Sequence, residues 1–347
     1  MMNMENYREY LFDACRRIFG VDSPSGYTAN VMALIRQMAE GMGYAFELTN
    51  KGCGVITIPG RSDEKTVGLS AHVDTLGAMV RSITSDGQLK FTPVGGPILP
   101  TLDGEYCKIR TRSGETYTGT ILSLSPAAHV HADSKSRPRD ADNMAVRIDE
   151  KVKTAEDVKA LGIGSGDYIF IDPKTTVTPS GFLKSRFIDD KGSVACLMTI
   201  LKIMREENLI PEYRTQFFIS VYEEVGHGAA AIPAGISELV AVDMGCIGED
   251  LNCTEYDVSI CAKDSGGPYD YELTSRLIQL AKDNGLSYAV DIYPFYGSDV
   301  GAARSAGHDI KGGLIGPGVH ASHGMERTHA EGMENTIRLA MLYLGCR

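Results

Sequence analysis

The sequence predicts an α/β protein in which a sheet with helices on both faces is interrupted by a small β domain. Two observations support this fold class. Strands and helices alternate near both ends of the chain, and short β-like runs separated by Gly, Asp and Pro fill the stretch from about 78 to 172. Such alternation is typical of α/β sheets, whereas many short strands with turn residues between them are typical of a small barrel or sandwich.

The N-terminal elements are two helices followed by three strands. Helical periodicity covers residues 4–19 and about 26–42, the second after the turn-forming run VDSPSG. Strands follow at YAFEL, GVITI and VGLSAH, and the last of these, residues 67–72, is apolar enough to be buried on both faces. In the β-rich stretch, the one clear helix is TAEDVKALG.

After residue 185 the alternation of helices and strands resumes. A helix over about 190–207 carries five apolar residues on one face: Val194, Leu197, Met198, Leu201 and Met204. The later elements are the strands TQFFISVY, ELVAVD and DVSICAK, a helix at 270–284, the strand SYAVDI, a helix at 298–306, the strand DIKGGLI and a helix at 333–344. We therefore expect an α/β domain built from residues 1–74 and 176–347, with the β domain at 75–175 inserted between them.

Composition excludes several classes of protein. The chain of 347 residues has a net charge of −11 and no basic run, which argues against binding to nucleic acids or anionic membranes. It has no apolar stretch long enough to span a membrane, and its start lacks the apolar core of a signal peptide. Eight scattered cysteines without a CxxC pair indicate reduced, mostly buried thiols in a cytoplasmic protein.

Acids and a histidine stand at the carboxyl ends of the apolar strands. His72 and Asp74 follow VGLSAH, Glu223 and Glu224 follow TQFFISVY, and Asp243 ends ELVAVD. Further candidates are the acids Asp189 and Asp190, directly before a helix, and the histidines of the loop GPGVHASHGMERTH: His320, His323 and His329. Ligands bind beyond the carboxyl ends of the strands in such sheets, so we expect these side chains to lie near one another.

Each of these features alone has an ordinary structural explanation. Paired acids before a helix usually serve as N-cap and first-turn charges, and a histidine at a strand end is usually a hydrogen-bonded structural residue. Five strand or helix ends that bring acids and histidines to one edge are harder to explain, because their repulsion and desolvation would cost several kcal/mol without a cation. The set predicts a dinuclear site for divalent metal ions with a spare glutamate as general base.

At these residues the chain resembles the tetrahedral aminopeptidases, the family within the dizinc exopeptidases that includes glutamyl and deblocking aminopeptidases. The resemblance rests on SAHVDTLG, FIDDKG, YEEVG, VDMG and SHGMERTH, which occur in the family's order and spacing. It covers essentially the whole chain. It implies a three-layer, mixed-sheet catalytic domain like those of zinc exopeptidases, with the insertion as a small β-barrel.

The resemblance also implies the roles of the site residues. His72, Asp189 and Asp243 would hold one metal ion, and Glu224, His323 and the shared Asp189 would hold the other. Glu223 would be the general base, and Asp74 would orient His72. His320 and His329 remain alternatives to His323. The ions are expected to be Zn²⁺, with Co²⁺ or Mn²⁺ as alternatives.

The implied reaction is removal of N-terminal residues from short peptides by an activated water. The segment DIYPFYGSDVGAA resembles the family's specificity loop, which would place Gly297, Ser298 and Asp299 near the first substrate side chain; Ser298 could equally cap the following helix. The resemblance further implies that the inserted domain pairs subunits and that dimers assemble into a hollow dodecamer.

Other functions remain open from the sequence. A dizinc deacylase or carboxypeptidase could use the same acids, although such relatives usually carry an α/β lid instead of a β-barrel. A glycosidase also needs two carboxylates but no cluster of histidines. A catalytically silent peptide-binding assembly would typically have lost a ligand or the base, and all of them are present here.

Overall fold

The computed structural model describes residues 4–347, which divide into two compact units. The first unit contains the residues up to 75 together with residues 174–347, and the second contains residues 76–173. Both ends of the chain thus belong to the same unit.

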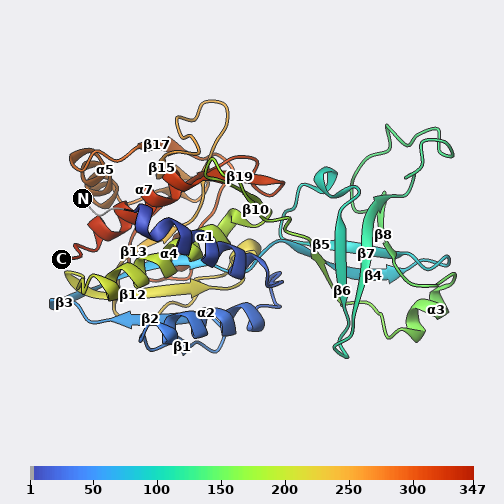
Figure 1. Ribbon diagram of the computed structural model, residues 1–347, viewed down its shortest axis with the longest axis horizontal. Coiled ribbons are helices and arrows are strands. Elements are labelled where there is room, and N and C mark those ends of the chain that lie inside the picture. The colour runs from blue at the N-terminus through green and yellow to red at the C-terminus, as the bar shows by residue number, and fades with distance from the viewer. Residues whose placement is uncertain (1–3) are drawn as a thin grey trace. The chain divides into compact units, whose positions relative to one another are not determined.

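A ten-stranded mixed sheet forms the middle of the first unit (Figure 1). Along the sheet the strands are β1 (Glu47–Leu48), β2 (Gly54–Ile58), β12 (Tyr213–Ser220), β3 (Ser62–His72), β13 (Ile236–Val242), β18 (Lys311–Val319), β15 (Val258–Asp264) and β16 (Gly267–Pro268), with β14 (Gly245–Cys246) beside β18 and β17 (Tyr288–Ile292) beside β15. β12, β3, β13 and β18 run parallel to one another. Their carboxyl ends therefore share one edge of the sheet.

Helices cover both faces of this sheet, as expected. They are α1 (Glu5–Phe19), α2 (Ala29–Gly41), α4 (Ile188–Glu206), α5 (Tyr271–Asp283), α6 (Asp299–Ser305) and α7 (Ala330–Tyr343). On β18, a Cβ on Gly312 would meet Val300 of α6, whereas a Cβ on Gly313 would meet Leu273 and Leu277 of α5. Successive strand residues point to opposite faces, so α5 and α6 lie on opposite sides of the sheet.

Helix α4 is buried on almost every side. It packs against α1, α7 and β3, and its buried residues run without a gap from Ile188 to Leu201. The sequence predicted one apolar face, but a helix that is apolar nearly all round belongs in the interior. Asp189 and Asp190 have non-helical backbone angles, so the regular helix begins after these two acids.

A three-stranded sheet in the first unit was not predicted. It consists of β10 (Thr176–Val177), β11 (Phe182–Ser185) and β19 (Glu326–His329). β19 pairs antiparallel with β11, so that Ser185 lies opposite Glu326. This pairing brings the histidine-rich loop next to the segment that leads into α4.

The second unit is a closed six-stranded barrel, which confirms the predicted β-barrel insertion. Around the barrel the strands are β4 (Gly77–Ile83), β5 (Leu89–Val94), β8 (Met144–Ile148), β7 (Thr116–Ser123), β6 (Tyr106–Arg110) and β9 (Tyr168–Ile171). The unit also contains η1 (Leu99–Leu102) and α3 (Ala155–Ala160), which begins with a capping box between Thr154 and Asp157. Phe91, Ile109 and Ile121 are fully buried and form part of its core.

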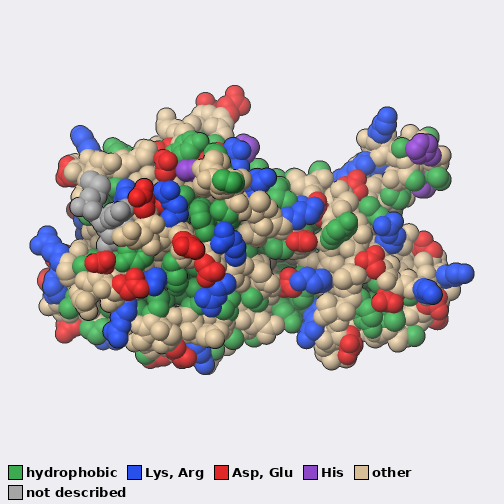
Figure 2. Space-filling model, in the orientation of Figure 1, with side chains coloured by type: hydrophobic (Ala, Val, Ile, Leu, Met, Phe, Trp, Pro, Cys, Tyr) green, Lys and Arg blue, Asp and Glu red, His purple; other side chains and the backbone are tan. Residues whose placement is uncertain are grey.

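The charged surface, the helices and the cysteines bear on what the composition of the sequence predicted. Acidic and basic side chains are interspersed on the face shown in Figure 2. Among the residues that the structure describes, no helix combines the length and the apolar character needed to cross a membrane. All eight cysteines are free, and six of them are buried.

Candidate active site

The parallel strands bring the expected acids and histidine to one edge of the sheet. His72 is the last residue of β3, and Asp243 follows β13. Beyond β12, Tyr222 has a left-handed backbone conformation with φ 68° and turns the chain into the short helix η2 (Glu223–Val225). Because β3, β12 and β13 run in the same direction, Glu223 and Glu224 lie at the edge that also carries His72 and Asp243.

His72 is the buried centre of this group. Its Nε2 lies 3.1 Å from Asp189 Oδ1, 3.7 Å from Glu223 Oε2 and 3.9 Å from Asp243 Oδ2. On the other side of the ring, Nδ1 lies 3.0 Å from the main-chain carbonyl oxygen of Asp74 and 3.6 Å from its Oδ1. The Nδ1 contact fixes the ring so that Nε2 faces the carboxylates, as in a metal-binding histidine.

Asp189 lies between two imidazoles. Its Oδ1 faces His72, while its Oδ2 lies 3.5 Å from His323 Nε2. His323 Nε2 is also 3.6 Å from Glu224 Oε2. Asp189 therefore faces His72 with one carboxylate oxygen, and with the other it faces His323, which in turn lies beside Glu224.

The other two histidines of the loop make different contacts. His320 is exposed, and its backbone pairs with that of Arg327. His329 Nδ1 accepts a hydrogen bond from the N–H of Glu331, and its Nε2 lies 2.8 Å from the carbonyl oxygen of Ser180. His329 is thus the N-cap of α7, which begins at residue 330, earlier than the expected 333. Neither histidine reaches the acid cluster.

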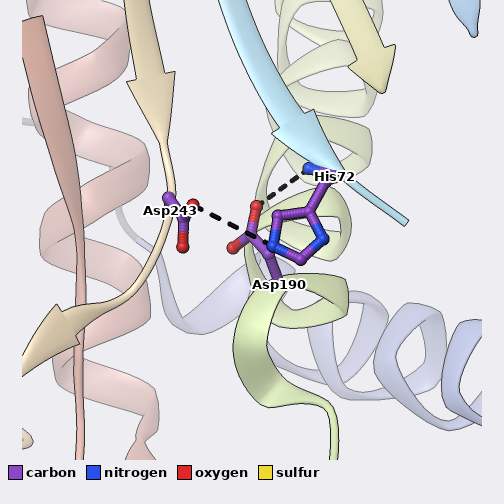
Figure 3. A group of neighbouring side chains, drawn as sticks. All are labelled: His72, Asp190 and Asp243. Carbon is purple, nitrogen blue, oxygen red and sulfur yellow. Dashed lines mark hydrogen bonds and ion pairs between the residues drawn. The ribbon is translucent and has the colours of Figure 1, made fainter. Parts of the chain in front are cut away.

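Asp190 also faces His72. Its Oδ2 accepts the backbone N–H of His72 at 3.0 Å, and Figure 3 shows Asp190, His72 and Asp243 converging from three elements. Among residues 4–347, two groups have donor atoms close enough to hold a metal ion: His72 with Asp190 and Asp243, and His72 with Asp189 and Glu224. Asp190 Oδ2 already accepts a backbone N–H, whereas the two oxygens of Asp189 face the imidazole nitrogens of His72 and His323.

Glu326 is a buried acid that sequence reasoning missed. Its Oε2 accepts the backbone N–H of Asp189 at 3.1 Å, and its Oε1 accepts that of His323 at 3.0 Å. One carboxylate thus connects the two segments that carry these side chains. A glutamate in a histidine-rich loop gives no local signal of this role, which depends on the pairing of β19 with β11.

Asp74 holds the turn that carries the glutamates. It accepts hydrogen bonds from the backbone N–H groups of Glu223 and Glu224, at 3.1 and 3.4 Å. Its Oδ2 also accepts the hydroxyl of Ser25 at 2.5 Å, a contact that the sequence did not reveal. The carbonyl oxygen of Asp74 lies nearer to His72 Nδ1 than its carboxylate does, and the carboxylate accepts the N–H groups of the turn.

Burial and mutual repulsion oppose ionisation of several acids in the cluster. Burial, together with the charge of neighbouring carboxylates, raises the pKa of Glu223 and of Glu224 well above the ordinary range. Burial and the charge of Asp189 raise the pKa of Asp243 to about 7. Burial and the same charge raise the pKa of Glu326 to about 8. This electrostatic pattern is typical of functional sites.

The pKa values of His72 and Asp189 are shifted in the directions that favour charge. Burial alone would lower the pKa of His72, but hydrogen bonds to Asp189 and Asp74 and nearby negative charges raise it well above 6.5. Burial would raise the pKa of Asp189, but hydrogen bonds with His323 and His72 hold it well below its usual value. Imidazolium and carboxylate partly neutralise each other here, and the other acids remain uncompensated.

The donor atoms fit a centre for divalent metal ions. Two buried oxygens, Glu224 Oε1 and Asp190 Oδ1, have no hydrogen-bond partner among residues 4–347. Imidazole nitrogens and carboxylate oxygens are ligands that Zn²⁺ prefers. A cation among these acids would offset their repulsion and favour their ionised forms.

A cavity of about 730 Å³ adjoins Glu223 on the α6 side of the turn. Gly297 and Ser298 line it. The Ser298 hydroxyl also accepts the N–H of Gly301 at the start of α6, so this residue both caps the helix and faces the cavity. Asp299 is not part of the lining; it is buried, and its Oδ2 accepts the hydroxyl of Ser220 at 2.6 Å.

The sequence and the fold each resemble those of proteins named as aminopeptidases or peptidases. A putative aminopeptidase YhfE from Bacillus subtilis (strain 168) is 44% identical over 330 residues, which is 95% of each chain. Among solved structures, aminopeptidase APDkam598 from the archaeon Desulfurococcus kamchatkensis shares the fold with a TM-score of 0.87 at 20% identity, covering 97% of this chain and 95% of that one. The Pyrococcus horikoshii TET1 peptidase shares it with a TM-score of 0.83 at 21% identity, over 96% and 99% of the two chains.

These similarities define the class of the protein as a peptide hydrolase of the aminopeptidase type. The profile of the M42 glutamyl aminopeptidase family matches residues 52–339, a range that includes every candidate site residue. The chain belongs to the M42 glutamyl aminopeptidase family, in agreement with the resemblance found in the sequence.

Proposed function

We propose that the protein is an aminopeptidase that removes N-terminal residues from short peptides with a dinuclear metal centre. The observation that carries this proposal is the position of Asp189, whose two oxygens face His72 and His323 separately. His72, Asp189 and Asp243 would hold one ion, and the shared Asp189 with Glu224 and His323 would hold the other. Zn²⁺ fits these donors, and Co²⁺ or Mn²⁺ are alternatives.

Glu223 is the proposed general base. Ions in such a centre supply Lewis acidity and lower the pKa of water. Glu223 accepts the proton of the attacking water and later donates it to the amine of the departing peptide. Asp74 keeps Glu223 in place through the backbone of the turn. The cavity lined by Gly297 and Ser298 receives the first substrate side chain, and Asp299 supports the end of β12 behind it.

The experiment that tests this function is a panel of aminoacyl-p-nitroanilides, assayed on metal-stripped protein with and without Zn²⁺, Co²⁺ or Mn²⁺. We expect metal-dependent release from substrates with a free amine and none from their N-acetylated counterparts. Hydrolysis of only the N-acetylated compounds would instead indicate a deacylase. If two ions bind but no substrate is cleaved, a silent peptide-binding assembly replaces the proposal.

We further propose that the inserted domain, residues 75–175, pairs subunits and that dimers assemble into a dodecamer in the cytoplasm. The Pyrococcus horikoshii TET1 peptidase, a structural neighbour, can assemble into a tetrahedron or a large octahedral shell. Ile98, Tyr106 and Val130 are large apolar side chains exposed on the second unit, as expected of an interface. Light scattering should give about 450 kDa, twelve times 37.5 kDa. A monomer at micromolar concentration would contradict this assembly.

A further inference from the structure

A second cavity, of about 520 Å³, lies on the other side of the turn that carries the proposed base. Its wall includes Tyr27 in the loop before α2, Arg36 on α2, Lys51 in the turn between β1 and β2, and Tyr222. The mechanism proposed above uses none of these four residues.

The position of this cavity relates it to substrate. Tyr222 lines it, while the next residue, Glu223, lines the cavity assigned to the first substrate side chain. Tyr27 follows Ser25 by two residues, and the hydroxyl of Ser25 binds Asp74. The two cavities therefore flank the turn that carries the base, and a peptide cleaved there would have its departing part on the side of Tyr222.

The cavity also presents unneutralised positive charge. Within residues 4–347, neither Arg36 nor Lys51 pairs with a carboxylate, although the chain has a net charge of −11. The guanidinium of Arg36 lies over the ring of Phe46, with its Cζ 5.4 Å from the centroid. Stacking on an aromatic face fixes a guanidinium while leaving its N–H groups available.

Lys51 is held at the same turn. Its Nζ donates to the carbonyl oxygens of His227 and Gly228, the latter at 3.0 Å. These two acceptors leave one of the three ammonium protons available and do not cancel the charge. The ring of His227 stacks on that of Tyr222, with centroids 5.0 Å apart. Lys51 is thus linked through His227 and Tyr222 to the turn that carries the proposed base.

We propose that this cavity binds the free C-terminal carboxylate of the substrate, with Arg36 as the main contact and Lys51 as a second charge. This inference rests on the proposed function. An α-carboxylate is ionised at neutral pH, and guanidinium binds carboxylates through two parallel hydrogen bonds. The preferred substrates are then short peptides whose departing part reaches from the scissile bond to Arg36, and blocking their C-terminus weakens recognition.

The test compares tri- and tetrapeptides that have a free C-terminus with the same peptides as C-terminal amides. The N-terminal residue is the best one from the p-nitroanilide panel. For wild type, we expect kcat/KM to be about tenfold higher for the acid than for the amide at the favoured length, since a hydrogen bond to a charged group is stronger than a neutral one. In Arg36→Gln this ratio should fall to about one.

Two variants make the ratio interpretable. Arg36→Lys should keep part of the preference, because the charge remains while the two-pronged geometry is lost. Lys282→Gln removes an exposed cation near the end of α5 and should keep the full wild-type ratio. Acid and amide are compared on the same variant, so a general loss of activity cancels, and Arg36→Lys still reports if Arg36→Gln does not fold.

The outcomes separate the two proposals. If wild type cleaves p-nitroanilides but treats acids and amides alike, or if Arg36→Gln retains the wild-type ratio, the carboxylate site is overturned and the aminopeptidase function stands. If wild type cleaves neither p-nitroanilides nor peptides, the proposed function itself fails.

Discussion

Removal of metal ions should make the stability of this protein fall as pH rises. Burial and the charge of Asp189 raise the pKa of Asp243 from 3.8 to about 7 in the folded protein, and burial together with the same charge raises that of Glu326 from 4.5 to about 8. Between the ordinary and the raised pKa values, the folded state binds more protons than the unfolded state. The free energy of unfolding of the chelated protein therefore decreases with increasing pH in this window.

The size of the effect follows from the pKa of Asp243. A rise from 3.8 to about 7 corresponds to about 4 kcal/mol, lost progressively as pH increases between these values. The raised pKa of His72 acts in the same direction, because the folded state retains a proton that the unfolded state has released above about pH 6.5. The lowered pKa of Asp189 makes stability rise with pH, but only up to about its ordinary value of 3.8. It therefore does not oppose the fall in stability at higher pH.

Urea unfolding of the chelated protein, measured at about pH 5, 6, 7 and 8, checks this expectation. The midpoint should fall with pH, and saturating Zn²⁺ should remove or reverse the trend, since a bound cation favours the ionised carboxylates. Asp243→Asn in the chelated protein should show a shallower fall. A midpoint that stays level or rises from pH 5 to pH 8 without metal would refute the reasoning.

Three substitutions test the roles of individual side chains. Glu223→Gln should keep the metal content of wild type and lower kcat on p-nitroanilides by about 10²–10⁴-fold, and full activity would exclude Glu223 as the base. His323→Ala should lose about one ion per chain in elemental analysis whereas His320→Ala should not, because His323 lies beside Asp189 and Glu224 and His320 does not; the reverse result would reassign the ligand. Glu326→Gln replaces one of the two oxygens that hold the backbones of Asp189 and His323, so metal affinity in a chelator competition should fall by about 10- to 100-fold, and an unchanged affinity would contradict this positioning role.

Much of the fold could be predicted because its signals are local. VGLSAH, TQFFISVY and ELVAVD are apolar runs that end in acids or histidine, and they form three neighbouring strands of the sheet. The density of short β-like runs predicted a small barrel or sandwich, and the resemblance to the family favoured the barrel. Strands β10, β11 and β19 were not, since they have only two to four residues each and little apolar character.

The acids and histidines of the cluster could be predicted, but the residues that hold them in position could not. The order of acids and histidines along the chain indicated the cluster, yet three candidates for the last histidine remained until pairing between β11 and β19 placed His323 beside Asp189. Glu326 and Ser25 act through contacts with residues about 50 to 140 positions away, and no periodicity records such contacts. The sequence likewise led to no prediction for Arg36 or Lys51.

The discontinuity of the first unit has a consequence for the order of events on the ribosome. The barrel is formed by one continuous stretch, residues 76–173, and can fold as soon as that stretch has emerged. β3 is made before the barrel but obtains its neighbours β12 and β13 only after the chain has been made beyond residue 242. An apolar central strand thus waits through the synthesis of an entire domain, and nascent chains halted before that point should be the species that recruits chaperones.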